Sequence, residues 1–329
     1  MEKFKAFRIH KDGEKIRGRF DELTLDDLSA GEVVIESSFS GINYKDALAA
    51  TGAGKILRKF PLVGGIDVAG TVIHSDDGRY SEGDSVVITG CGLSEEFDGG
   101  YSEIVRVKGD SVIPLPVGLS EQQAMILGTA GFTAALAIIR MEHNGLAPGG
   151  LPVVVTGATG GVGSLAVDML TGAGYQVTAV TGKADSKAYL EELGTSEILH
   201  REQIDFGERP MEKAIWAGAI DNVGGEMLTW LTRTMSWWGS IASIGLVGGH
   251  ELHTTVMPFI LRGINILGIN SMATPRELRL KVWQRLAGDL KPAHLGQICT
   301  RVIDFDELPG SFDEYLHGKA TGRSIVKIR

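Results

Sequence analysis

A run of β-branched residues that breaks into glycines is the feature that most constrains the fold of this chain. The segment 152–167, PVVVTGATGGVGSLAV, is typical of a buried strand, a tight turn and the start of an apolar helix. Gly157, Gly160 and Gly163 let backbone N–H groups approach an anion, and the positive end of the helix points to the same place. The segment predicts a dinucleotide pyrophosphate site, and the alternative is a close packing turn without a ligand.

Beyond this turn, short apolar strands alternate with helical patterns. We expect helices at 187–193 and 276–290 and strands at 176–180, 197–199, 217–221, 240–244 and 264–268. This alternation predicts an α/β fold with a doubly wound parallel Rossmann sheet and right-handed crossovers.

The residues before the turn have a different pattern. Strands are expected at 32–39, 67–73 and 84–88, separated by glycine, Asp and Ser clusters that suit a β-rich, partly barrel-like domain. Ser120 offers an N-cap for an apolar helix over 121–141. The last segment, from residue 302, returns to a β pattern and is expected to rejoin the first domain. We therefore predict a β-rich domain of residues 1–122 and 295–329 and a Rossmann domain of residues 123–294.

The charge and the cysteine content of the chain exclude some classes of partner and of structural site. A net charge of −9 over 329 residues argues against a nucleic acid or an anionic membrane as the main partner. Cys91 and Cys299 are too few for a disulfide framework or a four-cysteine zinc lobe. The start of the chain lacks the apolar core of a signal peptide, and the apolar run 124–139 is short for a bilayer. We expect a cytoplasmic protein.

The end of the second Rossmann strand indicates the cofactor. NAD-binding units place an acidic residue there to accept the ribose hydroxyls, but this strand ends in Val180-Thr181-Gly182-Lys183. Without a carboxylate a 2′-phosphate is not repelled, and Lys183, Thr181 and Arg201 can contact it. NADPH is therefore favoured over NADH.

The order of these parts resembles the medium-chain dehydrogenase/reductase superfamily, in which a GroES-like β domain precedes the Rossmann unit. Segments 40–46, 64–70 and 128–133 resemble its quinone-oxidoreductase branch; segments 216–221, 254–262 and 322–327 resemble its acryloyl-CoA reductase subgroup. The resemblance covers nearly the whole chain. It implies NADPH-dependent reduction of an activated carbon–carbon double bond without metal.

The residues at the metal position support this implication. Zinc-dependent members of the superfamily have a cysteine where Asn43 stands and a histidine where Ile66 stands, and neither Asn43 nor Ile66 is a ligand that zinc prefers. Asn43 and Asp67 are expected to organise this position. His250 and His253 lie in a glycine-flanked loop and are interpreted as surface histidines. No metal site is predicted.

Conjugate reduction fits a site without a Lewis acid. We expect hydride transfer to the β-carbon of an enoyl thioester such as acryloyl-CoA, with hydrogen-bond donors at the thioester oxygen. Tyr44 is the candidate catalytic residue and nicotinamide contact, because its counterpart in the family contacts the cofactor; the alternative is a tyrosine that anchors a helix start. No general acid is identified, and water can serve.

The remaining cofactor contacts are predicted from position. Those for the pyrophosphate are Thr159, Gly160, Gly161 and Val162; for the 2′-phosphate, Thr181, Gly182, Lys183 and Arg201; for the nicotinamide ribose and carboxamide, Leu246, Asn270 and Ser271. Arg323 either faces cofactor or CoA phosphates or is a stabilising surface arginine. By analogy with the superfamily, the sixth strand is expected to form the edge of a homodimer. Trp237, Trp238 and residues 259–261 are expected in a core or an interface.

Other readings remain open. The glycine pattern with Tyr315 and Lys319 also satisfies a short-chain dehydrogenase pattern, but those enzymes begin with the glycine motif, and the required serine is missing before Tyr315. A quinone reductase or another enone reductase would use the same hydride donor. A non-catalytic NADPH-binding protein would have the same cofactor site.

Overall fold

The computed structural model describes residues 2–329 and divides into two compact units. Unit 1 contains the chain up to Thr129 together with Ser271–Ala287 and Leu295–Arg329, and unit 2 contains Ala130–Asn270 and Gly288–His294. The first boundary therefore follows Thr129, whereas the sequence placed it after residue 122. Residues 271–287, which we assigned to the Rossmann domain, pack in unit 1 instead.

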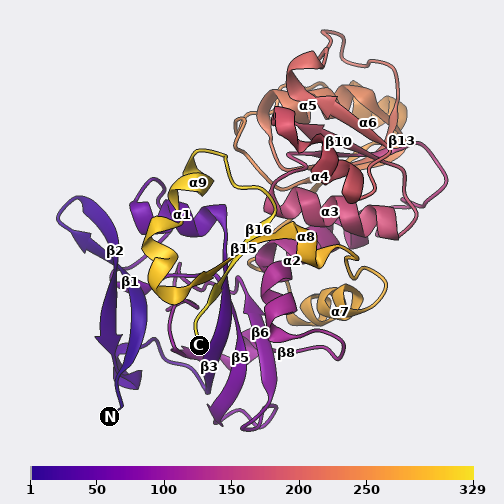
Figure 1. Ribbon diagram of the computed structural model, residues 1–329. Coiled ribbons are helices and arrows are strands. Elements are labelled where there is room, and N and C mark those ends of the chain that lie inside the picture. The colour runs from indigo at the N-terminus through magenta and orange to yellow at the C-terminus, as the bar shows by residue number, and fades with distance from the viewer. Residues whose placement is uncertain (1) are drawn as a thin grey trace. The chain divides into compact units, whose positions relative to one another are not determined.

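Unit 1 is built on two sheets. A small sheet has the order β2-β1-β4, and a seven-stranded sheet has the order β15-β16-β3-β5-β6-β8 with β7 on β3. The strands are β1 (Phe4–Asp12), β2 (Lys15–Leu23), β3 (Val33–Ile42), β4 (Leu62–Val63), β5 (Asp67–Ser75), β6 (Ser85–Thr89), β7 (Ile104–Val107), β8 (Ile113–Pro114), β15 (Cys299–Asp304) and β16 (Arg323–Lys327). The antiparallel pairing of β16 with β3 matches Ser324 with Ile42, so the C-terminus does rejoin the first unit (Figure 1).

The helices of unit 1 are short apart from one. They are α1 (Tyr44–Thr51), α7 (Arg276–Ala287), α8 (Leu295–Ile298) and α9 (Asp313–Leu316). Helix α1 begins directly after β3, so Asn43, its N-cap, stands between a strand end and a helix start. A core that includes Phe7, Ile42 and Tyr101 packs beneath α1 and α9.

Helix α2 (Glu121–His143) runs from unit 1 into unit 2. Ser120 caps its start, as the sequence predicts, because the Gln123 N–H donates to the Ser120 hydroxyl. Gln123 closes a reciprocal box, because its side-chain oxygen accepts from the Ser120 N–H. Gly128 interrupts the helix with φ +49°. Among residues 2–329, α2 alone is long and apolar enough to cross a membrane, and 83% of its most apolar window is buried inside the protein, as in the core helix of a soluble fold.

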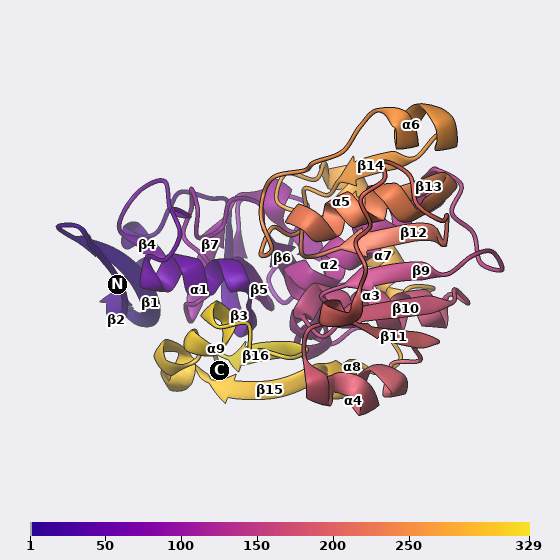
Figure 2. The ribbon, with the colours of Figure 1, turned by 90° about the horizontal axis from the view of Figure 1, so that it is seen from above.

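Unit 2 contains a six-stranded parallel sheet with the order β11-β10-β9-β12-β13-β14 (Figure 2). Its elements are β9 (Val153–Thr156), α3 (Gly161–Gly172), β10 (Val177–Thr181), α4 (Lys187–Glu192), β11 (Glu197–His200), β12 (Trp216–Asp221), α5 (Gly225–Thr234), β13 (Met235–Ser243), α6 (Met257–Arg262) and β14 (Asn265–Gly268). Counted along the unit, this is the order 3-2-1-4-5-6 of a dinucleotide-binding fold. The predicted Rossmann sheet is confirmed.

Candidate functional site

The glycine turn lies where the strand order of unit 2 reverses, between β9 and β12. Gly157 adopts φ +57°, which favours glycine. A Cβ on Gly163 would lie 2.3 Å from the carbonyl oxygen of Gly157 and 2.7 Å from Cα of Ala158, so only glycine lets α3 start this close to the strand. The first N–H groups of α3 have no partner within the helix and can bind an anion. The predicted pyrophosphate residues 159–162 all lie in this turn, with the Thr159 side chain buried.

A buried polar network continues from the turn onto β12. The Thr156 hydroxyl donates to Oδ1 of Asp221 at 2.7 Å, and the Asn222 side chain donates to the Thr156 carbonyl at 2.8 Å. Burial raises the pKa of Asp221, although donors from Thr156, Val223 and Gly224 oppose this. The Asn222 side-chain oxygen is buried and accepts no hydrogen bond from any residue within 2–329. An acceptor that is left over beside the glycine turn fits a bound dinucleotide.

The loop after β13 meets the same edge. A Cβ on Gly224 would lie 3.1 Å from Cα of Leu246, and the Gly248 N–H donates to the Val223 carbonyl at 2.8 Å. Leu246 is 66% exposed there. Asn270 follows β14, whereas Ser271 is already part of unit 1. The structure thus brings Leu246 to the turn after β12, and its contact with the nicotinamide ribose stays a prediction.

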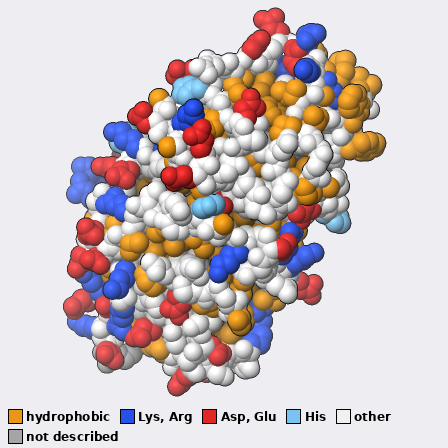
Figure 3. Space-filling model, turned by 45° about the vertical axis from the view of Figure 1, so that its right-hand side comes forward, with side chains coloured by type: hydrophobic (Ala, Val, Ile, Leu, Met, Phe, Trp, Pro, Cys, Tyr) orange, Lys and Arg blue, Asp and Glu red, His pale blue; other side chains and the backbone are white. Residues whose placement is uncertain are grey.

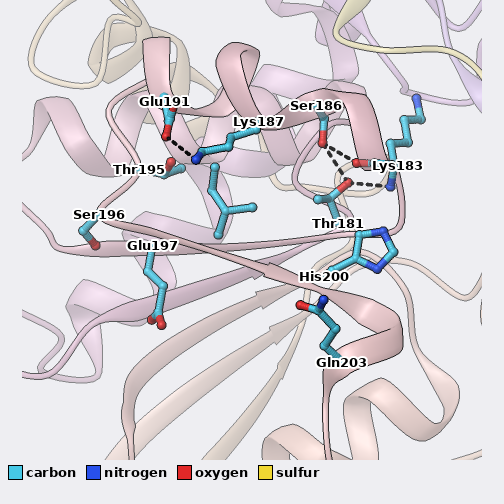
Figure 4. A pocket seen from close by; sticks show the side chains of 12 residues that line it. Thr181, Lys183, Ser186, Lys187, Glu191, Thr195, Ser196, Glu197, His200 and Gln203 are labelled. Atoms are coloured by element: carbon cyan, nitrogen blue, oxygen red, sulfur yellow. Dashed lines mark hydrogen bonds and ion pairs between the residues drawn. The ribbon is translucent and has the colours of Figure 1, made fainter.

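A pocket of about 440 Å³ opens beside the end of β10 (Figure 4). Thr181 and Lys183 line it, as expected of a 2′-phosphate site. Partial burial lowers the pKa of the Lys183 amine, and an anion would offset that cost. Arg201 does not line the pocket, but its guanidinium lies 3.7–3.8 Å from the position of a Cβ on Gly182. The four predicted residues 181–183 and 201 therefore come together.

Sequence reasoning missed the other polar residues of this pocket, among them Ser186, His200 and Gln203. The Ser186 hydroxyl donates to the Lys183 carbonyl at 2.7 Å and so fixes the turn. His200 is paired with Thr181 across the parallel strands β10 and β11. The register of the two strands could have identified His200 from the sequence, because the last residue of β11 lies beside the last residue of β10 in a parallel pair.

In unit 1 a second polar cluster surrounds Asn43. Its side-chain nitrogen donates to Asp67 Oδ2 at 2.8 Å and to Asp46 Oδ2 at 3.1 Å. Its oxygen accepts from Nη1 of Arg323 at 3.0 Å. Thr129 completes the cluster with hydrogen bonds from its N–H and its hydroxyl to Asp67, at 3.0 and 2.5 Å. Both donors of the Asn43 amide nitrogen, and one acceptor site of its oxygen, are therefore used inside the protein.

Burial dominates the electrostatics of this cluster. Asp46 and Asp67 are 1% and 0% exposed. Desolvation, followed by the neighbouring charge of Asp67, raises the pKa of Asp46 to about 7, against the opposing hydrogen bonds from Asn43 and from the Ile66 N–H. Burial at this position therefore favours the protonated form of Asp46.

Arg323 is not the surface arginine that we considered. It is 2% exposed and donates to the carbonyls of Ile126 and Ile42 at 2.9 and 3.1 Å. A Cβ on Gly128 would approach its Nη2 to 2.8 Å, which explains the glycine in the middle of α2. A contact of Arg323 with cofactor or CoA phosphates stays a prediction, and its internal partners argue against it.

These residues do not fit a zinc ion. The Asn43 nitrogen is a donor toward two carboxylates, and Ile66 is apolar and buried. Within residues 2–329 no three His, Cys, Asp or Glu side chains are placed to hold a metal. His253 contacts Glu251 at 3.2 Å in an exposed loop.

Tyr44, the first residue of α1, is 44% exposed beside the Asn43 cluster.

Comparisons with known proteins agree with this architecture. Residues 29–117 match the alcohol dehydrogenase GroES-like domain and residues 161–288 match the zinc-binding dehydrogenase domain. An acrylyl-CoA reductase of Ruegeria pomeroyi is 45% identical over 99% of both chains. A Bacillus subtilis protein named as a candidate quinone oxidoreductase is also 45% identical over 99% of both chains. An oxidoreductase of Salmonella enterica, solved in complex with NADP, is 44% identical over 99% of this chain and 100% of that chain, with a TM-score of 0.95.

A GroES-like β unit combined with a Rossmann unit defines a medium-chain dehydrogenase/reductase. Within that superfamily the chain belongs to the quinone-oxidoreductase-like family, and it is an oxidoreductase that depends on a nicotinamide cofactor.

Proposed function

We propose that this protein reduces the activated carbon–carbon double bond of acryloyl-CoA to give propionyl-CoA, with NADPH as the cofactor. The observation that carries the proposal is identity of 45–46% over 93–99% of the chain with proteins whose names make them acrylyl-CoA reductases. The side chains at Asn43 and Ile66, which do not suit zinc, agree with a reduction that needs no Lewis acid.

NADPH is supported by unit 2 itself. Residues 159–162 would bind the pyrophosphate, and the half-buried Lys183 with Thr181 and Arg201 would bind the 2′-phosphate. Relatives from Salmonella enterica and Escherichia coli were solved with NADP or NADPH, and a Bacillus subtilis relative with NAD. The chain has no carboxylate at the end of β10 that would favour NAD. When bound, the reduced nicotinamide supplies a hydride.

The work of the protein is to hold the acceptor and to stabilise charge at the thioester oxygen. Tyr44 is 44% exposed, and its hydroxyl can donate a hydrogen bond to that oxygen. The Asn43 cluster holds the start of α1 rigid, because the Asn43 N–H donates to Asp46 at 2.9 Å and so closes a capping box. The proton for the α-carbon can come from water.

The alternative acceptor is a quinone, which the name of the Bacillus subtilis relative favours.

The test mixes purified, chelator-treated protein with NADPH and acryloyl-CoA and measures the loss of nicotinamide absorbance. NADH in place of NADPH, and a simple quinone in place of acryloyl-CoA, are run in parallel. We expect fast oxidation with acryloyl-CoA that survives chelation and is weak with NADH. If only the quinone is reduced, the chain still belongs to the quinone-oxidoreductase-like family, but the proposed acryloyl-CoA reductase activity is wrong. Tight NADPH binding without turnover of either would favour another enone or a non-catalytic NADPH-binding protein.

We also propose that the protein is cytoplasmic and forms a homodimer through unit 2. Trp237, Trp238 and Ile260 are 67%, 75% and 72% exposed, so the core placement considered for them is wrong. Figure 3 shows hydrophobic side chains gathered at the upper right of the molecule. Arg262 holds α6 in place through the carbonyls of Arg233 and Met235, at 2.7 and 3.0 Å, while β14 ends the sheet with a free edge. Sedimentation velocity of Trp238→Glu should show a monomer, whereas unchanged mass would reject this interface.

A further inference from the structure

A basic segment follows α1 in unit 1. Lys55, Arg58 and Lys59, which we call the basic face, are all exposed. Between them Ile56 and Leu57 pack against the core. Because the apolar residues are anchored inward, the three cations are held outward on one short stretch of chain.

The basic face is joined to the start of α1 through the loop 90–97. The Arg58 N–H donates to the Glu95 carbonyl at 2.8 Å, and its guanidinium pairs with Glu96 at 3.3 Å. On its other side Glu95 pairs with Lys45 at 2.5 Å, and Lys45 follows Tyr44. Neither Lys55 nor Lys59 forms an ion pair within residues 2–329. Two carboxylates therefore face four cations here, in a chain whose net charge is −9.

The other end of the same loop lies beside Ser271 and Met272. The Cys91 N–H donates to the Met272 carbonyl at 3.3 Å, and a Cβ on Gly90 would lie 3.1 Å from Cα of Met272. One rim of unit 1 thus carries Ser271, the loop, Tyr44 and then the basic face. Helix α1 has eight residues, so its length of about 12 Å separates Tyr44 from the start of the basic segment.

We propose that the basic face binds the diphosphate and 3′-phosphate of coenzyme A; this inference rests on the proposed function. The pantetheine arm is long and flexible, so its thioester can reach Tyr44 while its phosphates meet the cations of the segment that follows α1. Arginine and lysine are the usual partners of phosphate groups. The local positive charge also offsets the repulsion that an acidic protein exerts on a polyanion.

The test removes the three charges with Lys55→Gln/Arg58→Gln/Lys59→Gln and compares acryloyl-CoA with acryloyl-pantetheine, which has no nucleotide. We expect KM for acryloyl-CoA to rise about tenfold or more at low salt with kcat unchanged, since screening weakens exposed charges. KM for acryloyl-pantetheine and for NADPH should not change. The control is Lys213→Gln/Lys281→Gln/Lys327→Gln, which removes the same charge from exposed positions elsewhere and should behave as wild type.

Calorimetry with free coenzyme A separates this inference from the proposed function. Suppose that the wild type reduces neither thioester but binds coenzyme A, and that the triple variant binds coenzyme A about tenfold more weakly. The proposed function would then be wrong, and the inference that the basic face binds coenzyme A would be supported. If wild type reduces both thioesters and the triple variant keeps the wild-type KM and coenzyme A affinity, the inference is overturned. An equal rise in KM for NADPH would overturn it too, because the face would then serve the cofactor.

Discussion

Asn43 donates a hydrogen bond of 2.8 Å from its side-chain nitrogen to Oδ2 of the buried Asp67. The same nitrogen also serves Asp46, so one neutral amide separates two buried carboxylates. A buried charge is tolerated only when it is paired or hydrogen-bonded. The amide at position 43 is therefore required by the charges around it, and a metal ligand there would leave both carboxylates without their shared donor.

Asn43→Asp should for this reason destabilise unit 1. It replaces a donor with a third carboxylate of the same size, and we expect a loss of about 3–5 kcal/mol in the free energy of unfolding at pH 8. The loss should be smaller at pH 5, where protonation relieves the repulsion. Gln176→Glu, the same change from amide to acid at an exposed position outside the helices, is the control and should change stability by less than about 0.5 kcal/mol. Urea unfolding measures both; equal effects would contradict the shared-donor role.

Asp46 gives the protein a definite pH dependence. Its pKa is about 7 in the folded protein and 3.8 as the ordinary value, so between about pH 4 and pH 7 the folded state holds a proton that the unfolded state has lost. The free energy of unfolding contributed by this group therefore falls as pH rises through that window. Asp46→Asn should flatten this slope, whereas the exposed control Asp26→Asn should keep it. A slope that is unchanged in Asp46→Asn would show that another group titrates.

Gly163→Ala tests the glycine turn. The added methyl meets backbone atoms of Gly157 and Ala158 at 2.3 and 2.7 Å, and backbone cannot move aside cheaply. We expect NADPH affinity to fall at least about tenfold, with a loss of stability of about 1–3 kcal/mol from overpacking. Gly172, at the other end of α3, has nothing within 4 Å of a Cβ, so Gly172→Ala should be neutral or stabilising. Fluorescence titration with NADPH compares the two.

Local pattern predicted much of this molecule. Strands that alternate with helices were enough to predict the Rossmann sheet, and Ser120 was enough to predict the start of α2. Contacts between distant residues were not accessible in the same way. Arg323 reaches Ile42 and Ile126, and nothing near residue 323 in the sequence says that it is buried. The first hairpin, β1 with β2, was also not placed, because half of its residues are charged and mask the apolar residues between them.

Cofactor preference should depend on Lys183. Lys183→Gln removes a half-buried cation from the pocket beside Thr181, and we expect KM for NADPH to rise about 10- to 100-fold, equivalent to about 1.4–2.8 kcal/mol. KM for NADH should stay the same, because NADH has no 2′-phosphate. Lys187→Gln, on the same pocket but paired with Glu191, is the matched control. A larger effect at Lys187 would place the phosphate nearer to α4.

Two tyrosines distinguish the mechanism that we favour from the short-chain alternative. Tyr44 is exposed at the start of α1, whereas the Tyr315 ring packs against the core of unit 1. Tyr44→Phe should lower kcat with acryloyl-CoA about 10- to 100-fold, because loss of one donor to a developing oxyanion costs about that much or more, and should leave NADPH affinity unchanged. Tyr315→Phe removes only a buried hydroxyl and should keep kcat within about twofold. Steady-state kinetics of both variants over pH 6–9 decides the matter: a collapse in Tyr315→Phe with full activity in Tyr44→Phe would move the chemistry to α9 and reverse the assignment.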